Sequence, residues 1–345
     1  MKGQPMKRTL IAAVLVSGAS PLFAQATLWT NFSDSGNSWT NAANWTNGVP
    51  TASTFANINR NPPSSYTVNH DFGTNEALRV VVGSTGLLTA TLDVQAGTLL
   101  NIAWTNGGGN SPGLQLNHGS IVNVYGTVLS TGGVHMAGNS TLNIDGGLYQ
   151  GLRGGSQTRI GNTGGTQTVN VINGGQLLNQ GSFTVGVNDT RDQGRLNVLD
   201  GYARFDSFAI GNRGTGVAII AAAGTVSNLG ALSLANQPFT GNAVGDATLV
   251  STGNFFNSGD ILIGQNISNV LSDARIVVAG GTFLQLGNSS RSVVVGDRMR
   301  GSLTVEGGAF LSTNNMIVGR TDTLGLTRGD GTVLVTGTGA MAVTN

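Results

Sequence analysis

The sequence lacks several features on which other classes of protein depend. It has no cysteine, so no disulfide can form, and only seven prolines in 345 residues. Only 10% of the residues are charged, and the formal net charge is +1. Disordered chains normally carry more charge or proline, and nucleic-acid-binding proteins normally carry a basic patch. The composition therefore argues against disorder and predicts no nucleic-acid partner.

Residues that favour helices are also scarce. Glutamate occurs only at Glu76 and Glu306. A helical protein would contain more Glu, Lys, Ala and Leu, with apolar residues at a period of 3.6. Instead the chain has 54 glycines and short Val, Ile and Leu runs separated by Gly and Asn. This pattern is typical of strands joined by tight turns, so we expect an all-β fold.

The N-terminal segment has the organisation of a secretory signal peptide. A basic start precedes the apolar run "TLIAAVLVSGASPLFA", and Ala-Gln-Ala follows at residues 24–26. These are the three parts of a cleavable signal, and the apolar run is too short and interrupted for a membrane span. We expect a signal peptide over residues 1–26, cleavage after Ala26 and an exported mature chain without a transmembrane segment.

One phrase recurs along the rest of the chain. Its first half is a short strand that ends in an apolar residue and glycine, and its second half alternates apolar and polar residues before glycine. About ten copies, each 20 to 30 residues long, lie between Leu78 and the end, which is the repeat length of solenoids. Leu234-Ala235 is a looser copy. The clear first halves end at Val82-Gly83, Ile160-Gly161, Val185-Gly186, Ile210-Gly211, Ile263-Gly264, Val295-Gly296 and Val318-Gly319.

The alternation within each copy predicts which side chains point inward. Leu303 and Val305 flank Thr304, and a period of two places aliphatic residues inside and polar residues outside. Glycine supplies the backbone angles of tight corners. We therefore expect a single-stranded, right-handed parallel β-helix over residues 78–345, with about ten coils and the last one incomplete.

Two stretches carry a resemblance to a known class of proteins. The last copy is "DGTVLVTGTGAMAVTN", and the N-terminal stretch "LWTNFSDSGNSWTNAANWTNGVPTASTFANI" has spaced tryptophans and a W-x-x-G-V-P ending. Both resemble exported bacterial repeat proteins of the type shared by autotransporter passengers and PEP-CTERM sorted proteins. The resemblance implies a β-solenoid at the cell surface or in the extracellular matrix, and it implies no reaction and no catalytic residue.

The chain departs from that class at its C-terminus. It has no V-P-E-P sorting tail, no final apolar helix and no terminal basic cluster, and it stops at Asn345 within a copy. We therefore expect it to be a fragment or a truncated product. Open strand edges invite pairing, so the uncapped C-terminal coil predicts end-to-end self-association.

Three tryptophans lie close together before the repeats, in residues 27–77, which we expect to form an N-terminal cap segment. Trp29, Trp39 and Trp45 have the size to cover the first coil, because a solenoid needs capped ends. Their alternative role is a carbohydrate-binding platform, on which indole rings stack against sugars. The sequence favours the cap.

Polar residues follow the glycine corners of several copies. If they stack in a column, they form either an asparagine ladder bonded to its own turns or a ligand or calcium ladder. The calcium pattern G-G-x-G-x-D is missing, so we expect a structural ladder. The residues are Asn162, Asn212, Asn236, Asn266 and Asp297.

Charged residues gather in the longer loops with both signs mixed. Such mixtures usually form a solvated surface whose ion pairs add little stability. We therefore expect Asp297 to be screened by solvent and Asp297→Asn to be nearly neutral. The histidines, His70, His118 and His135, are far apart in sequence and lack the pattern of a metal site, so we expect surface histidines. The sequence predicts no catalytic, metal-binding or cofactor-binding residue.

These observations favour an exported structural or adhesive β-solenoid, secreted or at the cell surface, that is not an enzyme. Its partners would be glycans or other surface proteins, met by polar faces and variable loops. The alternative is a β-helix polysaccharide lyase or glycoside hydrolase, because carboxylates from neighbouring coils can meet at the spacing that glycoside hydrolysis uses. A groove lined by clustered carboxylates and Arg or Lys would favour the enzyme.

Overall fold

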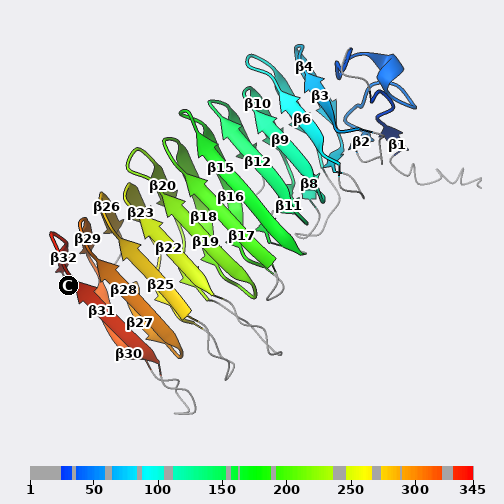
Figure 1. Ribbon diagram of the computed structural model, residues 1–345. Helices are drawn as coiled ribbons and strands as arrows, with labels where there is room; N and C mark the ends of the chain where they lie inside the picture. Colours follow the sequence, from blue (N-terminus) through cyan, green and yellow to red (C-terminus); the bar gives the residue numbers. More distant parts are fainter. Residues whose placement is uncertain are drawn as a thin grey trace, which may run out of the picture.

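The computed structural model is a parallel β-solenoid in which the chain winds repeatedly around one long axis (Figure 1). Every pairing between its strands is parallel, as in β12 with β15 or β28 with β31. The predicted all-β solenoid of about ten coils is confirmed. The structure describes residues 25–32, 36–58, 64–83, 88–104, 112–152, 157–161, 164–187, 192–235, 246–265, 273–287, 290–320 and 329–344.

Each coil has three faces, and each face takes one strand per coil. The first face is a sheet of its own, and the second and third faces are joined in a larger sheet. The strands of the first face are β3 (Tyr66–His70), β6 (Ala90–Val94), β9 (Ser120–Val124), β12 (Ser140–Asp145), β15 (Gly165–Ile172), β17 (Asp192–Val198), β19 (Thr215–Ile220), β22 (Ala247–Ser251), β25 (Asp273–Val278), β28 (Arg300–Val305) and β31 (Asp330–Val335).

The other two faces are built in the same way. The second face contains β4 (Thr74–Ala77), β7 (Leu99–Ile102), β10 (Thr127–Ser130), β13 (Leu148–Gly151), β20 (Thr225–Asn228), β23 (Asn254–Asn257), β26 (Thr282–Gln285), β29 (Ala309–Ser312) and β32 (Ala340–Val343). The third face contains β1 (Gln25–Leu28), β2 (Thr54–Ile58), β5 (Arg79–Val82), β8 (Pro112–Leu116), β11 (Gly133–Met136), β14 (Thr158–Ile160), β21 (Leu232–Leu234), β24 (Ile261–Ile263), β27 (Ser292–Asp297) and β30 (Asn315–Arg320). β16 (Gln176–Val185) and β18 (Tyr202–Ile210) run through both faces.

Inward side chains form continuous rows along the axis. Leu303 is in register with Ile276 of the previous coil and Val333 of the next. On the second face, the rings of Phe255 and Phe283 stack at 4.5 Å between centroids, and Phe310 continues the stack at 5.3 Å. Leu303 and Val305, which the alternation predicts to point inward, are buried, as are Ile160, Val169, Val171 and Val295. The core is therefore a thin column that runs the length of the rod.

The recurring apolar-glycine pairs are corners of the coil. Gly211 has a φ of +67°, and Ala235 keeps a φ of +52° at the looser copy. At the same corner, glycine is the second residue of the first-face strands β19 and β28. A Cβ on Gly216 would lie 2.4 Å from the nitrogen of Gly211, and a Cβ on Gly301 would lie 2.4 Å from that of Gly296. This close approach explains why glycine opens the second half of the repeat as well as closing the first.

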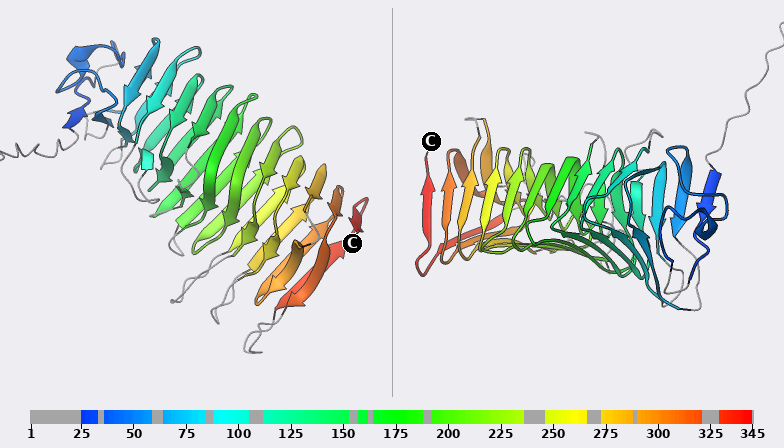
Figure 2. Two further views of the ribbon diagram at one scale, coloured as in Figure 1. Left: turned by 180° about the vertical axis from the view of Figure 1, so that it is seen from behind. Right: turned by 90° about the horizontal axis from the view of Figure 1, so that it is seen from above.

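The coils start earlier than residue 78. β3 already pairs in parallel with β6, and β4 with β7, so the first complete coil opens at Tyr66. Before it, β1, β2 and the short 3-10 helix η1 (Ala42–Asn44) form the N-terminal end of the rod (Figure 2). Residues 1–24 of the predicted signal peptide lie outside the described residues. In the described part of the chain, no helix is long and apolar enough to cross a membrane.

The other end of the rod leaves part of its inward rows open. Val318 and Val335 are 48% and 44% exposed. Their register partners one coil earlier, Val295 and Val305, are fully buried. An inward side chain in this fold is therefore buried only when a further coil covers it.

The glycine corners allow a direct stability test. Gly174 and Gly211 both have positive φ, but a Cβ at Gly174 would meet nothing within 4 Å, whereas at Gly211 it would lie 2.6 Å from the carbonyl oxygen of Asp246. We expect Gly174→Ala to lower the unfolding free energy by about 1–2 kcal/mol through backbone strain alone. Gly211→Ala should cost about 1–3 kcal/mol more because of the steric clash. Urea unfolding measures both variants, and equal losses would contradict this account of the corner.

Candidate functional site

The three tryptophans form a buried cluster at the N-terminal end of the rod. Trp29 and Trp39 are fully buried, and Trp45 is 4% exposed. Trp45 lies 5.0 Å from each of the other two rings in edge-to-face contacts, and its Nε1 donates to the carbonyl oxygen of Trp39 at 2.8 Å. This packing agrees with the predicted cap. Stacking on a sugar needs an exposed ring face, and none of the three rings offers one in this structure.

The prediction of surface histidines is wrong for His70. It is fully buried, its ring lies 5.7 Å from that of Trp39, and its Nδ1 lies 2.9 Å from Thr98 Oγ1. Burial lowers the pKa of His70 to about 4, so the ring is neutral at pH 7. His135 is partly buried, and burial with nearby arginines lowers its pKa to about 4. Only His118 is exposed. Among the described residues no group of histidines and carboxylates has the arrangement of a metal site.

An asparagine ladder exists on strands of the first face, whereas the ladder predicted at the corners is not tested by the described residues. Of the corner residues, Asn162, Asn236 and Asn266 lie outside the described residues. The observed ladder points outward. Each amide donates to the side-chain oxygen one coil nearer the N-terminus, at 2.7 Å for the first bond and 2.8 Å for the next three. Its members are Asp93, Asn123, Asn143, Asn170 and Asn197.

A second polar row is buried inside the rod, at the turn between the second and third faces. Asn228 donates to Asn257 at 2.7 Å, and both amides also donate to carbonyl oxygens of their own turns. Gln285 and Ser312 continue the row in the next two coils, joined by a bond of 2.6 Å. Because buried polar groups are costly unless they are hydrogen-bonded, this row stabilises the turns that it crosses. The repeat pattern of the sequence does not predict this row.

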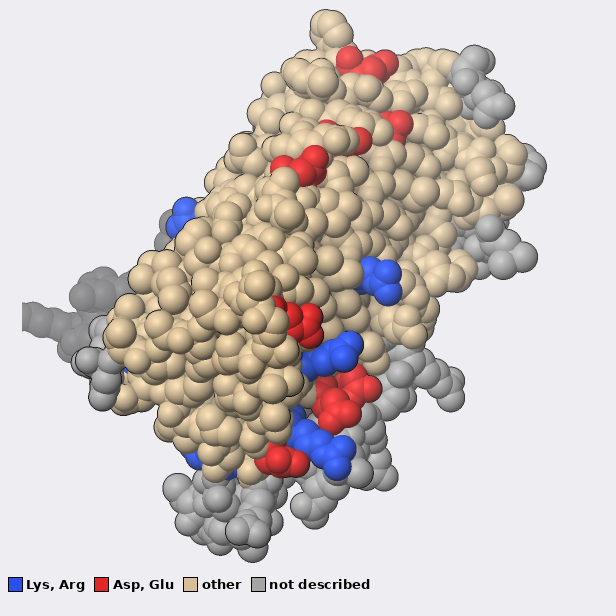
Figure 3. Space-filling model, turned by 60° about the vertical axis from the view of Figure 1, so that its left-hand side comes forward, with Lys and Arg blue, Asp and Glu red and all other residues tan. Residues whose placement is uncertain are grey.

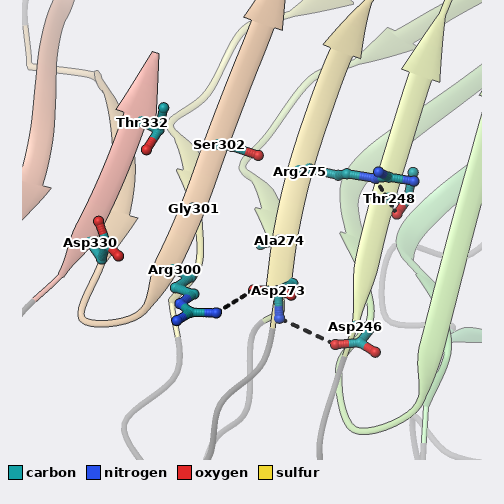
Figure 4. Close-up of a pocket in the computed structure, with 10 residues that line it drawn as sticks. All are labelled: Asp246, Thr248, Asp273, Ala274, Arg275, Arg300, Gly301, Ser302, Asp330 and Thr332. Carbon is teal, nitrogen blue, oxygen red and sulfur yellow. Dashed lines mark hydrogen bonds and ion pairs between the residues drawn. The ribbon is translucent and has the colours of Figure 1, made fainter. Parts of the chain in front are cut away.

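A charged hollow lies on the first face near the C-terminal end (Figure 3). It has a volume of about 440 Å³ and crosses β22, β25, β28 and β31. Asp246, Asp273, Arg300 and Asp330 occupy equivalent positions of four successive coils, and Arg275 lies two residues after Asp273 on β25 (Figure 4). The charged residues that line it are Asp246, Asp273, Asp330, Arg275 and Arg300. We call this feature the charged groove.

The charged groove contains both carboxylates and guanidinium groups. Arg300 lies 3.9 Å from Asp273, and the backbone N–H of Asp273 donates to Asp246 Oδ1 at 3.2 Å. The side chains of Arg300 and Asp273 are 59% and 73% exposed. Such exposure leaves these groups accessible to a polar ligand. The acid of a glycosidase is normally sheltered from water, and these groups are not. The geometry suits binding through hydrogen bonds and ion pairs.

The expectation that solvent screens Asp297 is wrong. Asp297 is 1% exposed, and Arg320 donates two hydrogen bonds to its carboxylate, at 2.8 Å from Nε and 2.6 Å from Nη2. These bonds, above all, raise the pKa of Arg320. Asp297 therefore joins two coils, and its burial could not be read from a loop that looks solvent-exposed in sequence.

With this geometry established, comparisons with known proteins add no relative. No protein-family model, no curated protein and no solved structure matches the chain.

The tryptophan cluster predicts a large effect on stability. Trp45→Ala removes the ring that contacts both other indoles, and deleting a buried large aromatic typically costs about 3–5 kcal/mol. We expect a loss of that size in chemical unfolding, with little change in glycan binding per folded molecule. Loss of glycan binding with unchanged stability would contradict the cap.

The two aspartate pairs form a matched test. Asp297→Asn should lower the unfolding free energy by about 1.5–3 kcal/mol, because it weakens charge-assisted hydrogen bonds to a buried carboxylate. Asp273→Asn breaks an exposed pair and should cost less than about 1 kcal/mol. Denaturant titration of both variants measures the difference. If Asp297→Asn lowers the unfolding free energy no more than Asp273→Asn does, the buried pair of Asp297 and Arg320 contributes no more stability than the exposed pair.

Proposed function

We propose that the protein is an exported structural or adhesive β-solenoid that presents polar faces and loops to glycans or other surface proteins. The observation that supports this proposal is the regular display of polar side chains on the first face. The asparagine ladder repeats one amide per coil over successive coils. Coils in such a stack are about 4.8 Å apart. A rigid row of this kind suits a repetitive partner.

Export and surface location belong to the same proposal. They are supported by the signal-like segment at residues 1–26 and by the resemblance to autotransporter passengers and PEP-CTERM sorted proteins.

The charged groove supports a second candidate function, cleavage of a polysaccharide. Asp246 and Asp273 occupy equivalent positions of neighbouring coils. Backbones of neighbouring coils are about 4.8 Å apart, and carboxyl pairs about 5–5.5 Å apart serve retaining glycosidases. Arg275 and Arg300 could hold an acidic sugar. The strong exposure of Asp273 favours binding over catalysis.

One experiment separates these functions. The full chain is incubated with immobilised neutral and acidic polysaccharides and with intact bacterial cells, and both retained protein and released sugar fragments are measured. We expect retention without release. Sugar release that is lost in Asp246→Asn and in Asp273→Asn would establish the enzyme instead. If the protein is not retained and no sugar is released, both functions are contradicted.

A further inference from the structure

A second hollow lies where the first face turns into the second, in the N-terminal half of the rod. Its volume is about 220 Å³, and it is lined by residues of four successive coils, from Gly97 to Gln176. It is separate from the tryptophan cluster and from the charged groove. All the residues that line it are described.

Tyr125 gives this hollow an accessible aromatic ring. The residue follows β9 and is 37% exposed. Its backbone N–H donates to Val94 at 2.8 Å, which fixes the start of the turn. Among the described aromatic residues, only Phe72 is more exposed, at 76%. Tyr125 therefore offers the ring surface that the three buried tryptophans lack.

Glycines form the floor beside this ring. Gly126 and Gly147 tolerate no side chain, because a Cβ would lie 2.2 Å from the carbonyl of Gln95 and 2.3 Å from that of Val124, respectively. Gly97 and Gly146 adopt positive φ in the adjoining turns. Since no side chain rises from these four positions, a flat ligand can approach the backbone beside the ring of Tyr125.

Acceptors and donors surround the floor without basic residues. Thr127 and Gln176 line the hollow. Asp93 and Asp145 do not line the hollow, but burial and then the negative charges of these two carboxylates raise the pKa of Tyr125. The phenol is therefore protonated at neutral pH and can donate a hydrogen bond. Each of the two carboxylates already accepts one amide, at 2.7 Å from Asn123 and 2.6 Å from Asn173. A carboxylate accepts about four hydrogen bonds, so both retain capacity.

From this arrangement we infer that the hollow beside Tyr125 is a subsite for one neutral sugar ring of a glycan. The apolar face of the sugar would lie against the phenol ring, which provides both an aromatic surface and a polar end. Its hydroxyls would donate to the carboxylates and exchange hydrogen bonds with Gln176 and Thr127. The two negative charges disfavour uronate or sulfated sugars. The inference rests on the proposed function, since it names the ligand class of the adhesive rod.

The test uses the full chain and soluble dextran, mannan and xyloglucan as neutral probes, with alginate and pectate as acidic ones. Affinities are measured by biolayer interferometry. We expect the wild type to bind at least one neutral probe more tightly than the acidic probes. Tyr125→Ala should weaken that binding at least tenfold, and Tyr125→Phe should weaken it less because the ring remains.

Phe72→Ala is the matched control, because Phe72 is an exposed aromatic in the equivalent turn after β3, two coils earlier. It should leave the affinity unchanged, and both alanine variants should keep the unfolding midpoint of the wild type. Unchanged neutral-glycan binding in Tyr125→Ala, or binding of acidic probes alone, overturns the subsite but leaves the adhesive function standing. If no glycan and no cell surface retains the protein, both the subsite and the proposed function fail.

Discussion

The structure depends on one constraint, which is that each coil completes the burial and the backbone pairing of its neighbours. A coil presents one strand edge forward and one backward on every face, and its inward side chains contact the rows above and below. No single coil can satisfy these requirements alone. The inward side chains at the two ends of the rod therefore have a neighbouring coil on one side only. Large indoles fill the N-terminal end, whereas Val318 and Val335 remain exposed at the other.

Much of the fold was predictable because its signals are local. Alternation such as Leu303-Thr304-Val305 places side chains inside or outside without knowledge of the neighbouring coil. Glycine corners mark the bends in the same local way. The start of the first coil at Tyr66 was missed, since β3 and β4 are recognised only through their pairing with β6 and β7. Strand pairing between coils is a long-range property.

The candidate sites were less predictable, because they depend on which residues meet across coils. His70 looks like an isolated polar residue in sequence, yet Trp39 and Thr98 enclose it. Asp297 looks like one member of a charged loop in sequence, yet Arg320 of the next coil donates hydrogen bonds to it. Tyr125 belongs to no motif. The ladder on the first face was not predicted, because the pairing of Asn143 with Asn170 and of Asn170 with Asn197 depends on the register between coils.

The asparagine ladder also gives the rod a direction. All its amides donate toward Asp93 and the N-terminal end, so the row begins at a carboxylate and finishes with the carbonyl oxygen of Asn197. The next position in the row is Ile219, which has no side-chain donor. Aligned amide dipoles reinforce one another, and reversing one of them would break two bonds. A polymer lying along this face would meet a different order of donors and acceptors in each orientation, so the surface can distinguish the two ends of a chain.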